Sequence, residues 1–154
     1  MQPQAQAALR RVWLKQEQAR YRQRSQTQAD DVDVWRQLGR ICWELGEPEP
    51  ALNALDQALA LRPDDGECLL GRIVACMALD RAEEALAASV RMLASFPNHP
   101  DALLHQVEAL RRLGRPAEAL AVCDRLLSLS DLGPASRVAA LSAKVVLLGG
   151  GGRL

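Results

Sequence analysis

The chain has 154 residues, and its 19 basic and 19 acidic side chains give a formal net charge of zero. Hydrophobic residues make up 49% of the chain and aromatic residues only 3%. This composition favours helices over an all-β sandwich and excludes wholesale disorder, which requires low hydrophobicity and high net charge. A neutral chain also lacks the overall positive charge of a typical nucleic-acid binder, although a local basic patch remains compatible with it.

The sequence shows no segment typical of secretion or of membrane insertion. Its N-terminus lacks the apolar core of a secretory signal. The longest apolar run, 138–148, contains Lys144 and is too short to span a bilayer. The four cysteines include no CxxC pair, which does not favour a disulfide scaffold. We therefore expect a cytoplasmic protein with reduced thiols.

The first segment, residues 1–31, predicts a basic leading helix over 3–28. Residues 1–28 carry a net charge of +5 and the rest of the chain −5. Leu9, Val12 and Trp13 form the apolar side of this helix, and we expect them to dock it on the acidic remainder of the chain. Binding of the helix to RNA or to an anionic membrane is the alternative.

The rest of the chain repeats itself with a fixed period of about 34 residues. Ala51, Ala85 and Ala119 share this spacing, and so do Pro63 and Pro97. The same interval separates Leu45, Leu79 and Leu113, and Leu52, Leu86 and Leu120. So many positions in phase indicate a helical-repeat architecture.

Each repeat has the pattern of two helices joined by a turn. In the first repeat, apolar residues from Trp35 to Leu45 recur at helical spacing. Gly46 supplies the positive φ that ends a helix, and Pro48 suits the first position of the next one. Pro63 ends the second helix, and Asp64 and Asp65 are candidate caps for the helix that follows.

These features resemble the tetratricopeptide repeat (TPR) family, whose unit has this same length of about 34 residues. In the first repeat, six residues match the motif of this family: Trp35, Leu38, Gly39, Ala51, Ala58 and Pro63. The resemblance implies an all-α, right-handed solenoid with repeats at 32–65, 66–99 and 100–133. Segment 134–154 would be the first helix of a fourth repeat or a capping helix.

The last segment predicts a helix over about 135–148, with Val138, Leu141, Val145 and Leu148 in helical phase. The glycines that follow look like the turn into a further helix, stretched and then cut. Two interpretations stay open: a chain trimmed from a longer protein, and a natural cap with a flexible end.

The resemblance also implies a concave groove lined by the first helix of each repeat. The groove positions of the family correspond here to an apolar strip edged by charged side chains: Arg36, Arg40, Trp43, Leu70, Val74, Met77, Leu104, Glu108, Arg111 and Arg112. We interpret the groove as a site for a peptide or helix with apolar anchors. The alternative is that these residues pack on the leading helix or on the next element of a longer chain. No asparagine stands at the positions where some TPR proteins clamp a chaperone's C-terminal carboxylate.

The sequence gives no sign of catalysis or of a cofactor. His99 and His105 have no cysteine beside them, and we expect structural roles rather than a metal site. Cys42, Cys76 and Cys123 fall at buried helix positions, whereas Cys68 is expected to be exposed and reactive. No residues combine into a nucleophile, a base and an oxyanion stabiliser.

The sequence therefore predicts a non-catalytic protein-interaction module, an adaptor or co-chaperone that binds another protein. One alternative is the N-terminal recruitment domain of a longer enzyme, such as a TPR-bearing glycosyltransferase or sulfotransferase. The other is a nucleic-acid or membrane binder that works through the basic helix, partners that the neutral chain does not favour. A homodimer is left open.

Overall fold

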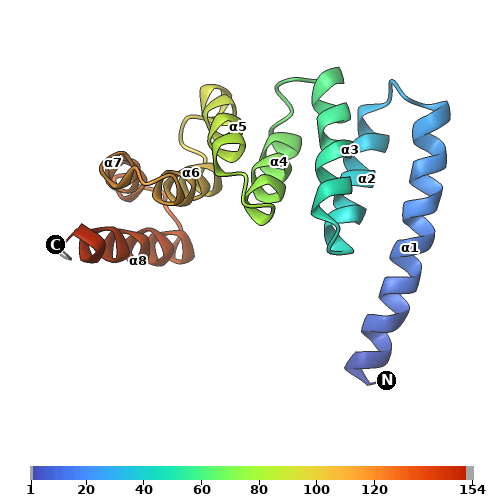
Figure 1. Ribbon diagram of the computed structural model, residues 1–154, viewed down its shortest axis with the longest axis horizontal. Helices are drawn as coiled ribbons and strands as arrows, with labels where there is room; N and C mark the ends of the chain where they lie inside the picture. Colours follow the sequence, from blue (N-terminus) through green and yellow to red (C-terminus); the bar gives the residue numbers. More distant parts are fainter. Residues whose placement is uncertain (1, 152–154) are drawn as a thin grey trace. The chain divides into compact units, whose positions relative to one another are not determined.

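The computed structural model describes residues 2–151, and within this range the chain forms helices and no strand (Figure 1). The helices are α1 (Pro3–Thr27), α2 (Val32–Glu44), α3 (Pro48–Leu61), α4 (Gly66–Ala78), α5 (Ala82–Ser95), α6 (Pro100–Arg112), α7 (Pro116–Leu127) and α8 (Pro134–Gly151). The chain forms two compact units, Met1–Ala75 and Cys76–Leu154.

The turns inside the repeats share one backbone conformation. Gly46, Asp80 and Gly114 occupy the same position in successive repeats and have φ values of 73°, 58° and 69°. This left-handed conformation follows the end of a helix and favours glycine, since glycine has no Cβ to clash. Pro48 then begins α3 at its N-terminal end, where no backbone N–H is needed. The roles predicted for Gly46 and Pro48 are therefore confirmed.

The core of the first unit is built on the contact of α2 with α3. Leu38, Cys42 and Ala51 pack together, and Ala51 has no exposed surface. The small side chain lets the two helices approach closely, where a larger one would force them apart. Trp35 is half-buried at the edge of this core, and its Nε1 donates a hydrogen bond of 2.8 Å to the Ala29 carbonyl in the loop before α2.

The leading helix docks on α2, but not through the predicted face. Leu9, Val12 and Trp13 are 52–58% exposed, so the prediction that they dock the helix is wrong. Leu14 packs instead against Ile41 and Leu45 of α2. Sequence apolarity pointed to the wrong side because the inner face of α1 is partly polar.

Gln18 is the polar residue at the centre of that inner face, with only 2% of its surface exposed. Its Nε2 donates to a Glu47 oxygen at 2.6 Å and lies 3.3 Å from the Cys42 sulfur. Lys15 pairs with the other Glu47 oxygen at 2.5 Å, and Arg10 pairs with Glu44. Hydrogen bonds from Lys15 and Gln18 lower the pKa of Glu47. The expected attraction between the basic helix and acidic side chains is thus present.

Asp65 joins two helices of the first unit, as its predicted role of cap required. One carboxylate oxygen accepts a hydrogen bond of 2.9 Å from the Cys68 N–H in the first turn of α4. The other oxygen pairs with Arg36 of α2 at 2.9 Å. Burial alone would raise the pKa of Asp65, but the hydrogen bonds from Cys68 and the charges of Arg36 and Arg62 outweigh burial and lower it.

In the second unit, a core of five buried side chains connects α6, α7 and α8. Its members are Val107, Leu110, Ala119, Cys123 and Leu147. Helix α8 contributes Leu147 to this core and also buries Ala140.

The end of the second unit differs from the sequence-based interpretation in two ways. The predicted apolar phase of α8 faces solvent, because Val138, Leu141, Val145 and Leu148 are 48–69% exposed. The glycines that were interpreted as a turn continue the helix as far as Gly151. Residues 152–154 of that predicted turn lie outside the described residues.

A matched pair of leucines on α1 tests how the leading helix docks. Leu14 is 4% exposed and Leu9 is 58% exposed. We expect Leu14→Ala to lower the free energy of unfolding by about 2–4 kcal/mol, because it leaves a cavity against α2. Leu9→Ala should change it by less than about 0.5 kcal/mol. Urea unfolding followed by circular dichroism measures both, and equal losses would contradict this docking.

The Asp65 carboxylate predicts a pH-dependent contribution to stability. Asp65→Asn keeps the shape but removes the charge that faces Arg36, which should cost about 1–3 kcal/mol at neutral pH. The native-state pKa is lowered, so the stabilisation is present above the unfolded-state pKa of about 3.9 and is lost as the pH falls through the native-state value. The difference between variant and wild type should therefore shrink below about pH 4.

Asp64→Asn is the control when the free energy of unfolding is compared with that of wild type at each pH, because Asp64 is the exposed neighbour of Asp65. It should stay within about 0.5 kcal/mol of wild type at every pH. A difference for Asp65→Asn that is the same at all pH values would show that the carboxylate charge contributes nothing.

Candidate functional site

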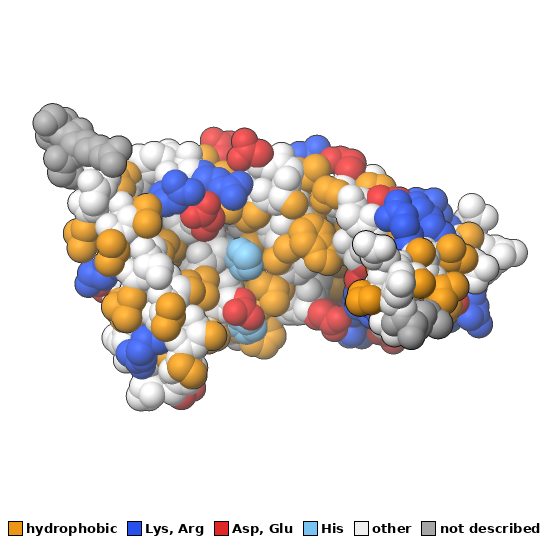
Figure 2. Space-filling model, turned by 90° about the horizontal axis from the view of Figure 1, so that it is seen from below, with side chains coloured by type: hydrophobic (Ala, Val, Ile, Leu, Met, Phe, Trp, Pro, Cys, Tyr) orange, Lys and Arg blue, Asp and Glu red, His pale blue; other side chains and the backbone are white. Residues whose placement is uncertain are grey.

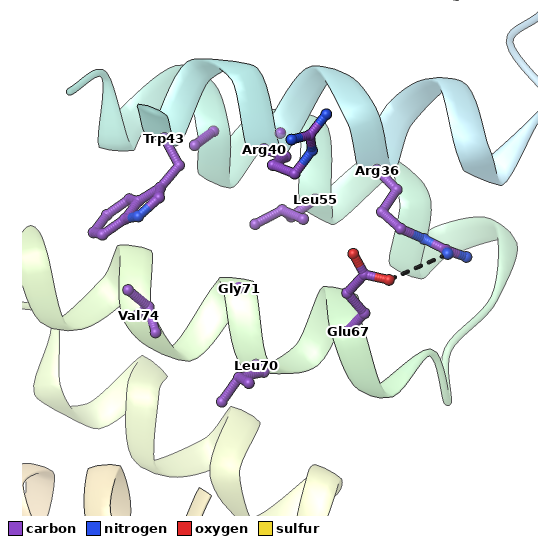
Figure 3. A pocket seen from close by; sticks show the side chains of 10 residues that line it. Arg36, Arg40, Trp43, Leu55, Glu67, Leu70, Gly71 and Val74 are labelled. Atoms are coloured by element: carbon purple, nitrogen blue, oxygen red, sulfur yellow. Dashed lines mark hydrogen bonds and ion pairs between the residues drawn. The ribbon is translucent and has the colours of Figure 1, made fainter. Parts of the chain in front are cut away.

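A pocket of about 240 Å³ lies in the first unit, between the facing sides of α2 and α4 and above α3 (Figure 3). The residues that line it are Arg36, Gly39, Arg40, Trp43, Ala51, Leu55, Glu67, Leu70, Gly71 and Val74. The lining is largely apolar, with charged groups near one end and an aromatic ring at the other. A concave, mostly apolar lining with a few polar groups is the usual composition of a ligand-binding pocket.

The floor of the pocket depends on two glycines that flank Leu55. A Cβ on Gly39 would lie 2.9 Å from the Leu55 Cγ, and one on Gly71 would lie 3.0 Å from its Cδ1. Both distances are too short for ordinary contact, so Leu55 keeps its place because neither neighbour has a side chain. Any other residue at these positions would shift Leu55 and change the depth of the pocket.

The apolar wall of the pocket comes from two helices. Trp43 extends from α2 across the opening toward Val74 of α4 (Figure 3). The Trp43 side chain is 41% exposed, a large apolar surface for an aromatic residue next to a pocket. A large, rigid ring that is partly open to solvent can bury much of its surface against a ligand at small entropic cost.

The two arginines of the pocket differ in their freedom. Arg36 is held by Asp65 at 2.9 Å and by Glu67 at 3.3 Å, which leaves little of its charge for a ligand (Figure 3). Arg40 donates to Gln37 at 2.8 Å and to Glu44 at 3.0 Å, but 55% of its side chain is exposed. Arg40 is therefore the cation at the pocket that an incoming carboxylate can reach.

The structure divides the ten predicted groove residues between the two units. Five of them line the pocket: Arg36, Arg40, Trp43, Leu70 and Val74. The other five belong to the second unit, where Met77 is only 8% exposed and Leu104 is half-buried.

The remaining three predicted groove residues of the second unit form one cluster around a glutamate. Glu108 accepts hydrogen bonds from Arg111 at 2.7 Å and from Arg112 at 2.9 Å. The hydrogen bond from Arg111, followed by that from Arg112, lowers the pKa of Glu108 to about 2 against the opposing effect of burial. Arg112 also donates to the Met77 carbonyl at 3.1 Å. This cluster ties α6 to the end of α4 within the second unit.

Sequence reasoning missed the floor of the pocket. Gly39 was expected only as a residue of the repeat motif, and Leu55 was not assigned to a binding site. Gly71 carried a usable signal, because a glycine inside a helix costs about 1 kcal/mol relative to alanine and marks a position where a neighbour can approach closely.

The cysteines and histidines have structural positions. All four cysteines are buried, so the prediction of an exposed, reactive Cys68 is wrong. Burial, followed by the hydrogen bond to Asp65, raises the pKa of the Cys68 thiol to about 12, far above that of reactive thiols. The His99 Nδ1 caps α6 by accepting from the Ala102 N–H at 3.4 Å, and burial lowers the pKa of His105.

Two further searches of the described residues bear on function. No group of three or more His, Cys, Asp or Glu side chains in residues 2–151 is placed to hold a metal ion. None of the helices in that range combines the length and the apolar character needed to cross a membrane.

Solved structures of low sequence identity share this fold. MamA matches with a TM-score of 0.82 and 17% identity, over 90% of this chain and 74% of its own. YrrB, described as a TPR protein with an unusual peptide-binding site, matches with a TM-score of 0.68 and 18% identity, over 86% and 66%. The second TPR domain of human RPAP3, in complex with an HSP70 peptide, matches with a TM-score of 0.67 and 17% identity, over 74% and 92%.

Comparison with curated proteins gives no match. Two family models, both described as tetratricopeptide repeat, match residues 32–75 and 79–136, together about two thirds of the chain. With these matches, the periodicity of the sequence and the shared fold, the all-α helical-repeat solenoid predicted from the sequence is confirmed, and the chain belongs to the tetratricopeptide repeat family.

Proposed function

We propose that this chain is a non-catalytic protein-interaction module, and that its first unit binds a peptide segment of a partner protein in the pocket between α2 and α4. The observation that carries this proposal is the apolar pocket itself, with the exposed Trp43 ring at one end and the exposed Arg40 beside it. Aromatic residues and arginine are the side chains most often found at the energetic centre of protein interfaces.

The shape of the pocket indicates which side chain it receives. Leu55 forms an apolar floor, and Trp43 and Val74 face each other across the opening (Figure 3). One aliphatic or aromatic side chain of a partner would fill this space and displace water from apolar surface. An acidic residue nearby in the partner would reach Arg40, whose bond to the neutral Gln37 is easily exchanged for a carboxylate.

Structures with the same fold support peptide binding as the general mode. The RPAP3 domain is in complex with an HSP70 peptide, and YrrB is described as having a peptide-binding site. The present pocket has arginines where TPR proteins that clamp a chaperone's C-terminus use lysine and asparagine. We therefore propose recognition of an internal apolar–acidic segment, consistent with an adaptor role.

Selection of peptides on the wild-type chain tests this proposal while the partner is still unidentified. Peptides taken from a random display library should be enriched in an aliphatic or aromatic residue close to Asp or Glu. We expect Trp43→Ala to lower the affinity for the selected peptides by about tenfold or more, because it removes the wall of the pocket. Arg40→Glu should weaken those with an acidic residue most strongly. Fluorescence anisotropy with labelled peptides gives the affinities.

Matched controls are available in the same chain. Trp13 is 52% exposed on α1 and Arg111 lies in the second unit, so Trp13→Ala and Arg111→Glu should leave binding unchanged. Selected peptides that bind Trp43→Ala as tightly as wild type would place the binding site elsewhere.

The outward face of α1 supports a second candidate function, attachment to an anionic membrane surface. Leu9, Val12 and Trp13 point away from α2 and are exposed, and residues 1–28 carry a net charge of +5. Figure 2 shows hydrophobic and basic side chains together around the N-terminal end of α1. A basic helix that exposes apolar side chains in this way can lie in the headgroup region with those side chains inserted.

Vesicle sedimentation distinguishes this candidate from the first. Trp13→Ala should reduce binding to phosphatidylserine-containing vesicles at low salt by several fold, while Trp43→Ala should not. Failure of the wild-type chain to bind such vesicles at low salt would remove this function and leave the peptide pocket unaffected.

A further inference from the structure

The pocket between α2 and α4 has room for an aromatic ring. Its volume is about 240 Å³, whereas an engineered apolar cavity of about 150 Å³ is enough to hold a benzene molecule. A valine or leucine side chain of a partner would leave part of this space empty, and the lining loses contacts wherever a gap remains. A side chain that carries a ring covers more of the lining.

Both sides of the pocket suit a flat ring. On the α4 side, Gly71 is part of the lining, and a glycine lets a ligand approach the backbone closely because it has no side chain. On the α2 side, Trp43 presents an indole ring that is 41% exposed (Figure 3). Two aromatic rings in contact gain energy beyond the area that they bury. An aliphatic side chain lacks that gain.

The two glycines of the pocket differ in what an added side chain would displace. A Cβ on Gly39 would lie 2.9 Å from the Leu55 Cγ and 3.5 Å from the Ala51 carbonyl oxygen. A Cβ on Gly71 would lie 3.0 Å and 3.4 Å from the terminal methyl carbons of Leu55, and 3.8 Å from its Cγ. Terminal methyl groups move more easily than the branch point that carries them. Gly71→Ala therefore keeps the fold and changes the pocket.

We propose, on the basis of the peptide binding proposed above, that the pocket selects an aromatic side chain of the partner and that Gly71 determines this preference. Because Gly71 is part of the lining, a methyl group added there takes space from the pocket, and the terminal methyl groups of Leu55 must move as well. The space that remains fits a smaller, aliphatic side chain. Gly71 is thus a specificity-determining residue.

Peptides that differ only in the anchor residue test the preference of the wild-type chain. In a peptide selected from the library, the apolar anchor is replaced in turn by phenylalanine, tryptophan, leucine and valine. We expect the aromatic versions to bind about tenfold more tightly than the valine version, with leucine between them, as measured by fluorescence anisotropy. Aliphatic versions that bind as tightly as aromatic ones would overturn the preference and leave the peptide pocket in place. A library that yields no apolar anchor would overturn peptide binding in the pocket, and the preference with it.

Gly71→Ala tests the residue that sets the preference. The variant should lower the affinity for the phenylalanine peptide by about tenfold and change that for the valine peptide by less than about twofold, because one carbon in an apolar pocket discriminates by about ten times or more. Circular dichroism of the variant should match that of wild type, since alanine favours a helix more than glycine does. An equal loss for both peptides would overturn Gly71 as the determinant.

A compensating variant and a control complete the test. Leu55→Val removes one carbon from the floor where Gly71→Ala adds one to the wall, so the double variant should regain affinity for the phenylalanine peptide. Gly149→Ala makes the same substitution in helix α8, where nothing lies within 4 Å of the added Cβ, and it should leave both affinities unchanged. A double variant that folds like wild type but binds as weakly as Gly71→Ala would contradict control by pocket size.

Discussion

The close approach of neighbouring helices is the constraint on which this structure depends. Ala51 sits without exposed surface between α2 and α3, and Gly39 and Gly71 lie within about 3 Å of Leu55 when a Cβ is built on them. Because these positions lack bulk, the helices pack tightly and Leu55 reaches up between α2 and α4. The pocket follows directly from this packing: the residue that fills the gap between two repeats is also the floor on which a ligand would rest.

Much of this arrangement could be predicted from the sequence, because the repeat encodes it locally. The positions of Gly46 and Pro48 determine where one helix ends and the next begins, and that information lies in two or three neighbouring residues. Five predicted groove residues also line the pocket, because a helix fixes the direction of each side chain once its register is known. The floor was missed because its depth depends on a contact between three helices, which a periodic pattern does not contain.

Electrostatic pairing explains the behaviour of the leading helix. Residues 1–28 carry a net charge of +5, and the rest of the chain carries a net charge of −5. Docking brings Lys15 to Glu47 and Arg10 to Glu44, and it buries Gln18 where a polar side chain can bond Glu47. A buried polar residue is stable only when its hydrogen bonds are made. The sequence shows that Gln18 is polar, but it does not show that Glu47 lies within hydrogen-bond distance. The apolar residues of α1 were therefore assigned to the wrong face.

The same reasoning applies to both ends of the described chain. Hydrophobic periodicity indicates that a helix has an apolar face, but it does not indicate which element covers that face. On α1 the residues Leu9, Val12 and Trp13 remain exposed, because the opposite face of the helix, with Gln18 bonded to Glu47, is the one that packs on the repeats. On α8 the stripe from Val138 to Leu148 remains outside because no following helix among residues 2–151 packs on it. Interior repeats cover each other, so in a helical-repeat protein uncovered faces collect at the ends. The exposed faces of α1 and α8 are therefore surfaces on which the described part of the chain gains further contacts without altering the pocket between α2 and α4.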